Sequence, residues 1–131
     1  MAFGFQAGVV HSDKVCRRLS FVDRDDDTRE HYFIIDIIDR SEESPEVPVP
    51  DMDNVYIERD DQMWGGYGGI NRVVLERDSL TLQLSPQMAT RMGEHDSIRI
   101  TFIVNDDEFR EMRQVLGLIM LGYESQLEFR C

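Results

Sequence analysis

The fold class is decided by the stretch Val73-Val74-Leu75-Glu76-Arg77-Asp78-Ser79-Leu80-Thr81-Leu82-Gln83-Leu84-Ser85. In its second half, leucines at positions 80, 82 and 84 alternate with polar residues, which is the period of a strand with one buried face. Val73 and Leu75 mark a preceding strand, and only the polar residues 76–78 separate the two. The stretch therefore predicts a β-hairpin.

Further strands are expected on both sides of this hairpin. Residues 97–104 alternate in the same way, and Val55 and Ile57 mark a short strand. Residues 32–38 are apolar on both faces except at Asp36, which favours a central strand. A weaker alternation at residues 17–21 indicates a first strand.

Two helices have clear start and stop signals. Ser85 followed by proline, with Gly93 a few residues on, predicts a short helix over residues 86–92. The main helix spans residues 105–121, where Asn105 and Glu108 have the spacing of a capping box. Together these elements predict an α+β fold: a mainly antiparallel sheet of five to seven strands, with the long C-terminal helix packed on one face and one short helix.

The length of 131 residues favours a single domain over residues 1–131. Residues 40–54 contain three prolines and several acids, and they read as an acidic surface loop. The sequence shows neither an apolar run long enough to span a membrane nor a convincing signal peptide. Cys16 and Cys131 are isolated thiols, which favours a reducing, cytoplasmic setting without deciding whether they ever pair.

The chain is strongly acidic, with a formal net charge of −12. Residues 20–61 contain 15 acids and four arginines, so they hold −11 of that charge. Such a charge disfavours nucleic acids and anionic membranes as partners and favours a partner with a basic face. Solubility alone is the alternative explanation.

Residues 60–70 concentrate glycine and aromatic residues beside two carboxylates. We expect Trp64 and Tyr67 to be presented on a thin glycine loop, where they can anchor a bound partner. The alternative is that the glycines form a turn or bulge and the two aromatic rings cover the sheet edge as structural lids.

Patterns for catalysis or metal binding are weak. The acids at residues 23–27 lack the glycine and the final glutamate of a calcium loop. The three histidines and two cysteines lack zinc spacing, and no nucleophile motif is present. The sequence therefore predicts no catalytic residue, metal or cofactor. Two alternatives stay open: a small glycosidase-like hydrolase using paired carboxylates beside Trp64, and a homo-oligomeric structural or adaptor module.

A family resemblance rests on the order of several motifs, of which the pairing of Asp61-Gln62 with Gly66-Tyr67-Gly68-Gly69-Ile70 is the most specific. The others are residues 32–38, 55–58, 74–82, 98–102 and 106–109. In this order they resemble the immunity protein 10 family of bacterial polymorphic toxin systems, over about residues 30–120. Met63-Trp64-Gly65 departs from the family pattern, and residues 1–30 lie outside the resemblance.

The resemblance implies a protein that binds and neutralises a cognate toxin domain. An inhibitor of this kind needs a few aromatic anchors within a complementary field of charge. We expect Trp64 and Tyr67 to be the anchors and Gln62 to fix the loop or to contact the partner's backbone. The charged contacts and the more distant steering charges are expected to be Glu58, Asp60, Asp61, Asp25, Asp26, Asp27, Glu42 and Glu43.

Overall fold

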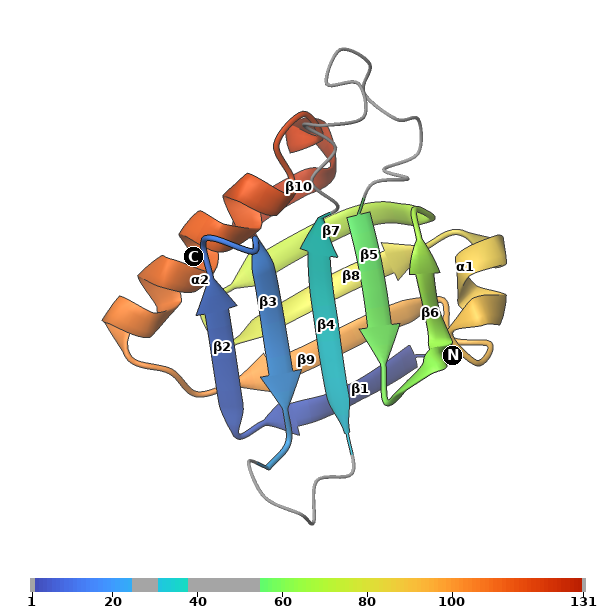
Figure 1. Ribbon diagram of the computed structural model, residues 1–131, viewed down its shortest axis with the longest axis horizontal. Coiled ribbons are helices and arrows are strands. Elements are labelled where there is room, and N and C mark those ends of the chain that lie inside the picture. Colours follow the sequence, from blue (N-terminus) through green and yellow to red (C-terminus); the bar gives the residue numbers. More distant parts are fainter. Residues whose placement is uncertain (1, 25–30, 38–54, 131) are drawn as a thin grey trace.

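The computed structural model describes residues 2–24, 31–37 and 55–130, and for Gln62 only the backbone. Two sheets and two α-helices make up this part of the chain (Figure 1). The strands are β1 (Ala2–Ala7), β2 (Val9–Asp13), β3 (Arg18–Val22), β4 (Tyr32–Ile37), β5 (Val55–Arg59), β6 (Asp61–Tyr67), β7 (Ile70–Glu76), β8 (Ser79–Leu84), β9 (Ser97–Phe102) and β10 (Leu127–Arg130). The helices are α1 (Pro86–Arg91), α2 (Asp106–Ile119) and the 3₁₀ helix η2 (Glu124–Gln126).

The strands divide evenly between the sheets. The first sheet has the order β1-β9-β8-β7-β10, with β1 parallel to β9 and β10 parallel to β7. The second sheet has the order β2-β3-β4-β5-β6 and is antiparallel throughout. The α+β class and the hairpin, now β7–β8, are confirmed. The structure has two sheets where we expected one. Four of its strands, β1, β2, β6 and β10, were not revealed by the sequence pattern.

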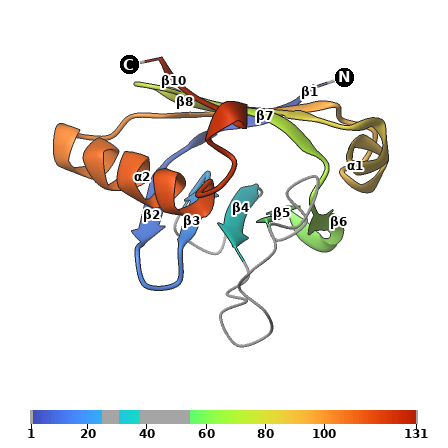
Figure 2. The same ribbon diagram turned by 90° about the horizontal axis from the view of Figure 1, so that it is seen from above.

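The two sheets pack face to face, and their strands cross (Figures 1 and 2). Phe21 on β3 packs against Phe33 on β4 and Phe102 on β9, with ring centroids 6.3 and 6.1 Å apart. The hairpin leucines are buried in the same layer. Alternation in each strand therefore places one apolar row between the sheets and leaves the other row outside.

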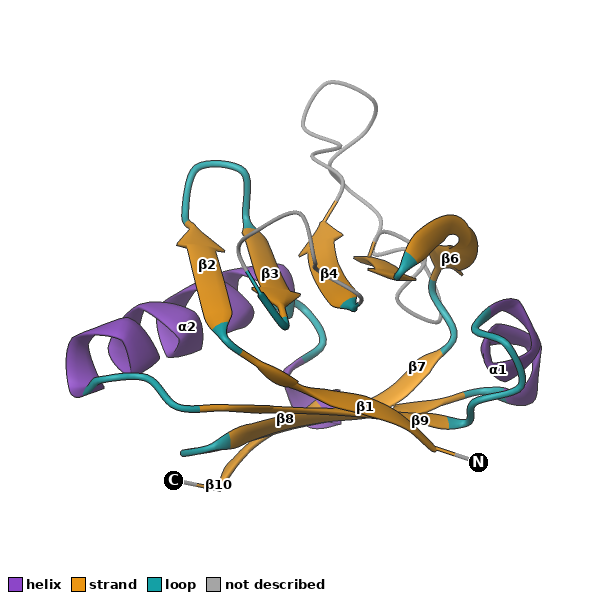
Figure 3. Cartoon of the chain, turned by 90° about the horizontal axis from the view of Figure 1, so that it is seen from below, coloured by secondary structure: helices purple, strands orange, loops and turns teal. Residues whose placement is uncertain are grey.

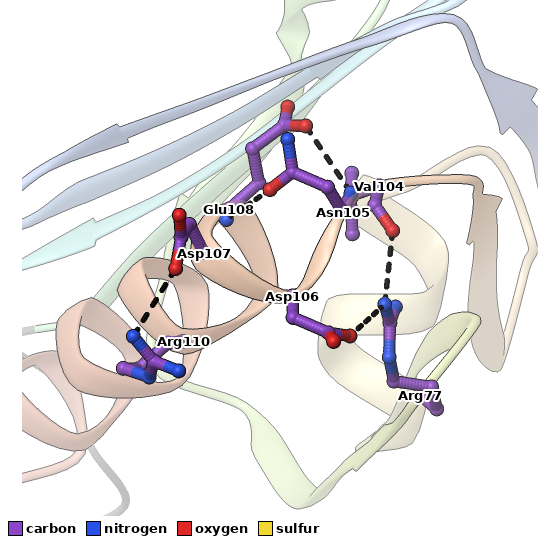
Figure 4. Close-up of polar contacts among 7 residues, drawn as sticks. All are labelled: Arg77, Val104, Asn105, Asp106, Asp107, Glu108 and Arg110. Atoms are coloured by element: carbon purple, nitrogen blue, oxygen red, sulfur yellow. Dashed lines mark hydrogen bonds and ion pairs between the residues drawn. The ribbon is translucent and has the colours of Figure 1, made fainter.

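Helix α2 closes one side of the sandwich, where it contacts β2 and β3 (Figures 2 and 3). The predicted capping box is present: Asn105 Oδ1 accepts from the Glu108 amide, and Glu108 Oε1 accepts from the Asn105 amide (Figure 4). Arg77 in the β7–β8 turn ties this helix start to the first sheet through Asp106 and the carbonyl of Val104. The helix is 14 residues long and ends at Ile119, two residues earlier than expected.

The chain passes from one sheet to the other at glycines. Between β1 and β2 stands Gly8, where a Cβ would lie 2.4 Å from the carbonyl oxygen of Asp23. Between β6 and β7 stand Gly68 and Gly69, which adopt the left-handed conformation with φ of 75° and 69°. Helix α1 lies at this second corner, on the opposite side of the sandwich from α2 (Figure 3).

Candidate functional site

The glycine-rich segment is a strand and a corner, not the loop that we expected. Residues 61–67 form β6, which pairs with β5 and places Gly65 opposite Glu58. A Cβ on Gly65 would lie 2.8 Å from the carbonyl oxygen of Ile57, and one on Gly69 would lie 2.6 Å from the Cβ of Met88. These glycines permit close backbone pairing and close packing of α1, which accounts for them without a flexible loop.

The outer face of the second sheet is the most prominent surface in the described part of the chain. No described helix covers it, because α1 and α2 lie at the two sides of the sandwich (Figure 2). We call it the open face. It is made of the residues that alternate with the buried rows of β2–β6, and these include Val9, His11, Asp13, Arg18, Ser20, Val22, Tyr32, Ile34, Asp36, Tyr56, Glu58 and Tyr67.

A carboxylate held by two tyrosines lies at the centre of the open face. The hydroxyl of Tyr32 donates to Glu58 Oε2 at 2.5 Å, and the hydroxyl of Tyr56 donates to Glu58 Oε1. Burial, followed by the bond to Glu58, raises the pKa of each tyrosine above its ordinary value. Tyr67 lies against Tyr56, with ring centroids 4.9 Å apart, and 49% of Tyr67 is exposed. The open face thus combines a buried negative charge with an accessible aromatic ring.

Two hollows border this arrangement. One, of about 400 Å³, opens on the open face and is lined by Glu58, Tyr32, Ile34, Val22, Ser20 and His11, with Phe21. The other, of about 570 Å³, lies between Tyr67, α1 and η2, with Arg91 and Gln126 in its wall. Tyr67 lines the second hollow and packs on Tyr56, whose hydroxyl donates to Glu58 in the wall of the first.

Trp64 and Asp60 lie in a different environment, at the edge between the sheets. The guanidinium carbon of Arg59 lies 4.8 Å from the centre of the Trp64 ring and 4.5 Å from that of Phe3. Asp60 Oδ2 accepts from Arg59 at 3.1 Å and lies 3.2 Å from His31 Nδ1. The contacts of Trp64 are those of a structural lid, so they favour the second of our two interpretations for this residue.

The predicted site residues are therefore divided. Glu58 and Tyr67 share the open face, whereas Asp60 and Trp64 both contact Arg59. Asp61 is exposed and accepts a hydrogen bond from the amide of Met63. The side chain of Gln62 lies outside the described residues, as do Asp25, Asp26, Asp27, Glu42, Glu43, Cys131 and the predicted loop at 40–54.

Sequence reasoning missed Tyr32 and Tyr56 as members of the site. A signal was present, since Tyr56 and Glu58 are two residues apart in one strand and must share a face. Tyr32 has no such local signal, because only the β4–β5 register brings it to Glu58.

Residues 2–24, 31–37 and 55–130 contain no group of three histidine, cysteine or acidic side chains placed to hold a metal ion. None of the described helices has the length and apolar character needed to cross a membrane. Cys16 is exposed and unpaired.

The family described as Immunity protein 10 matches residues 6–110, from β1 into the first turns of α2. No curated protein matches the sequence. The matched region includes all of the second sheet, so the open face lies within it.

Proposed function

The chain belongs to the immunity protein 10 family, and on this premise we propose that it binds one cognate toxin domain through its open face and so neutralises it. An immunity role calls for a binding surface rather than a catalytic centre. The observation that carries the proposal is the exposed ring of Tyr67 beside the Tyr32–Glu58–Tyr56 group, on a sheet face that no described helix covers.

The open face has the tyrosine-rich composition of an interface core. Tyrosine is enriched among residues that dominate binding energy, because it buries a large rigid ring and retains a polar end. Three of the four tyrosines in the chain lie here, in neighbouring strands. Tyr67 is therefore the anchor in this proposal, supported from below by Tyr56.

Charge supports a basic partner. The chain carries −12, and residues 20–61, which hold −11 of that charge, contain β4 and β5 of the open face. A toxin with a basic active surface would be attracted to so acidic a chain. We place the complex in the cytoplasm, because two isolated cysteines fit a reducing compartment.

The first experiment identifies the partner and tests protection. Tagged protein is used to capture partners from a lysate of the source organism at low and at high salt, and retained proteins are identified by mass spectrometry. The proposal expects one stoichiometric toxin-like domain. Co-expression of the captured domain with the wild-type chain should then restore growth that the domain alone prevents. Recovery of a second copy of this chain alone, with a concentration-dependent mass, would instead indicate a homo-oligomer and contradict the proposal.

The second experiment tests the anchor. Tyr67→Ala should weaken toxin binding by about 2 kcal/mol, roughly 30-fold in Kd, with the melting temperature nearly unchanged. Ile103→Ala is the control, because Ile103 is an exposed apolar residue (87% exposed) beyond the end of β9. Equal Kd values for both variants and the wild type would remove Tyr67 from the interface.

A further inference from the structure

The carboxylate of Glu58 is buried, and no cation among residues 2–24, 31–37 and 55–130 forms an ion pair with it. Only 8% of this residue is exposed. Charged side chains are rarely buried unless they are paired, because the low-polarity surroundings penalise an isolated charge. In the described part of the chain, two phenolic hydroxyls are the only groups bonded to it.

The two hydroxyls leave capacity on the carboxylate. Tyr32 uses one acceptor position on Oε2 and Tyr56 uses one on Oε1. An ionised carboxylate offers about four such positions, so each oxygen can accept one bond more. The hollow of about 400 Å³ opens directly onto this group, between Tyr32 and the apolar side chains of Ile34 and Val22.

We propose that this hollow, the Glu58 socket, receives an arginine side chain of the bound toxin domain. This proposal rests on the proposed function, and it identifies the kind of toxin side chain that would contact Glu58 at the centre of the open face. A guanidinium keeps its charge, presents several N–H donors in one plane and stacks on aromatic rings. It would supply the missing positive charge while its flat surface lies among Tyr32, Ile34 and Val22. Lysine fits less well, since its ammonium group holds its water strongly.

Another acid of the open face already has an arginine partner, unlike Glu58 in the described part of the chain. Asp36, in the next row, is paired with Arg18 at 2.8 Å. His11 lies at the opposite rim of the hollow. Gly65, opposite Glu58 on β6, is a positioning residue: a Cβ there would lie 3.0 Å from the Tyr56 hydroxyl, so its absence gives that hydroxyl room to reach Glu58.

A purely structural role for Glu58 makes a different prediction. The carboxylate could simply tie β4 to β5 through the two tyrosines. Such a tie needs no charge from outside and would show no preference between a charged and a neutral probe of the same shape. The test therefore measures charge selectivity, which the socket requires and the tie does not.

The probe is Nα-acetyl-arginine amide, titrated into ¹⁵N-labelled full-length protein and followed by NMR. Its neutral isostere, Nα-acetyl-citrulline amide, and Nα-acetyl-lysine amide are titrated in parallel. We expect weak, saturable shifts from the arginine probe at residues lining the hollow, and at least several-fold smaller shifts from citrulline. Glu58→Gln keeps the shape of the side chain and should abolish the arginine response. Glu111→Gln, at an exposed position on α2, is the matched control and should retain it.

Each other outcome overturns the proposal. Shifts spread over the acidic surface and unchanged in Glu58→Gln would show non-specific charge attraction. Equal responses to arginine and citrulline would leave Glu58 as a structural tie. An equal or stronger response to the lysine probe would mean that the Glu58 socket does not select arginine over lysine. Melting temperatures of both variants confirm that each is folded.

Binding of the captured toxin domain provides a separate test of the socket. Glu58→Gln should weaken its binding roughly tenfold or more, and Glu111→Gln should not change it. Equal binding by wild type and Glu58→Gln would overturn the socket while leaving the proposed function intact. If wild-type protein binds no toxin domain, the proposed function fails, and the probe titration still decides whether the socket exists.

Discussion

At the scale of single residues, Arg59 connects parts of the chain that are far apart in sequence. Its Nε donates to the carbonyl of Met92 at 3.0 Å, and its Nη1 donates to Asp60 at 3.1 Å. Its guanidinium lies between the rings of Phe3 on β1 and Trp64 on β6. Because β1 belongs to the first sheet and β6 to the second, this one cation links the two sheets at the side away from α2.

Arg59→Met should destabilise the fold by about 3 kcal/mol, because it leaves the partly buried Asp60 without its strongest partner. Urea unfolding followed by tryptophan fluorescence measures this directly, since Trp64 is the only tryptophan. Arg99→Met is the control: Arg99 is exposed on β9, so its loss should cost no more than about 0.5 kcal/mol. Equal stabilities of the two variants would contradict a linking role for Arg59.

His95, at the same edge of the sandwich as Arg59, makes the folding stability depend on pH. Burial, and then the charge of Arg59, lower the pKa of His95 below its ordinary value of 6.5. When the pH falls below about 6.5, the unfolded chain therefore takes up a proton that the folded chain does not, and folding stability decreases. The loss levels off once the pH is below the lowered pKa. We expect the unfolding free energy to fall more between pH 7.5 and 5.5 in wild type than in His95→Gln. The same pH dependence in both proteins would contradict this.

At the scale of elements, Gly69 and Gly117 have opposite effects on the stability of the fold. Gly69 has a φ of 69° and lies at the corner between β6 and β7, where a Cβ would meet Met88 of α1 at 2.6 Å. Gly117 lies within α2, and a Cβ there would meet nothing within 4 Å. The first glycine permits the chain to change sheets, whereas the second only weakens a helix.

Substitution by alanine separates the two cases. Gly69→Ala should cost about 2 kcal/mol or more, because alanine is strained in the left-handed conformation and clashes with α1. Gly117→Ala should raise stability by up to about 1 kcal/mol through helix propensity. Chemical unfolding of both variants measures the difference. A neutral Gly69→Ala would mean that the corner can be rebuilt without a left-handed residue.

At the scale of the whole molecule, the uneven charge sets the conditions for association. Residues 20–61 carry −11 of the net −12. Strands β4 and β5 of the open face belong to this segment, and we expect the charge of the segment to draw a basic partner toward the chain. Long-range attraction of this kind raises the association rate and is screened over about 10 Å at 0.1 M salt.

Replacing Asp25, Asp26 and Asp27 together by lysine should slow association with the captured toxin domain at low salt and change it little at high salt. Stopped-flow mixing across a salt series measures the effect. The control makes the same charge change outside residues 20–61, at Asp78, Glu94 and Glu111, and should slow association less. Equal slowing by both triple variants would show that only total charge matters and that its placement does not.

Local patterns predicted a large part of the fold. The hairpin, both helix caps and the strands at 32–37, 55–59 and 97–102 were readable because each depends on neighbours within about four residues. Strands β1 and β10 were not, since each is an edge strand held parallel to a distant partner. The glycines of β6 concealed a strand, because glycine ordinarily weakens one.

The sequence by itself determined the α+β class, the family resemblance and the acidic segment, and it pointed to Glu58 and Tyr67 as candidate contacts. Only the tertiary structure decided that Tyr32 and Tyr67 join Tyr56 and Glu58 on the open face, and that Trp64 and Asp60 face Arg59 instead. The physical reason is register. Side chains alternate across a strand, so residues 58 to 67 are divided between two environments by the β5–β6 pairing and its bulge, and no local spacing encodes that division.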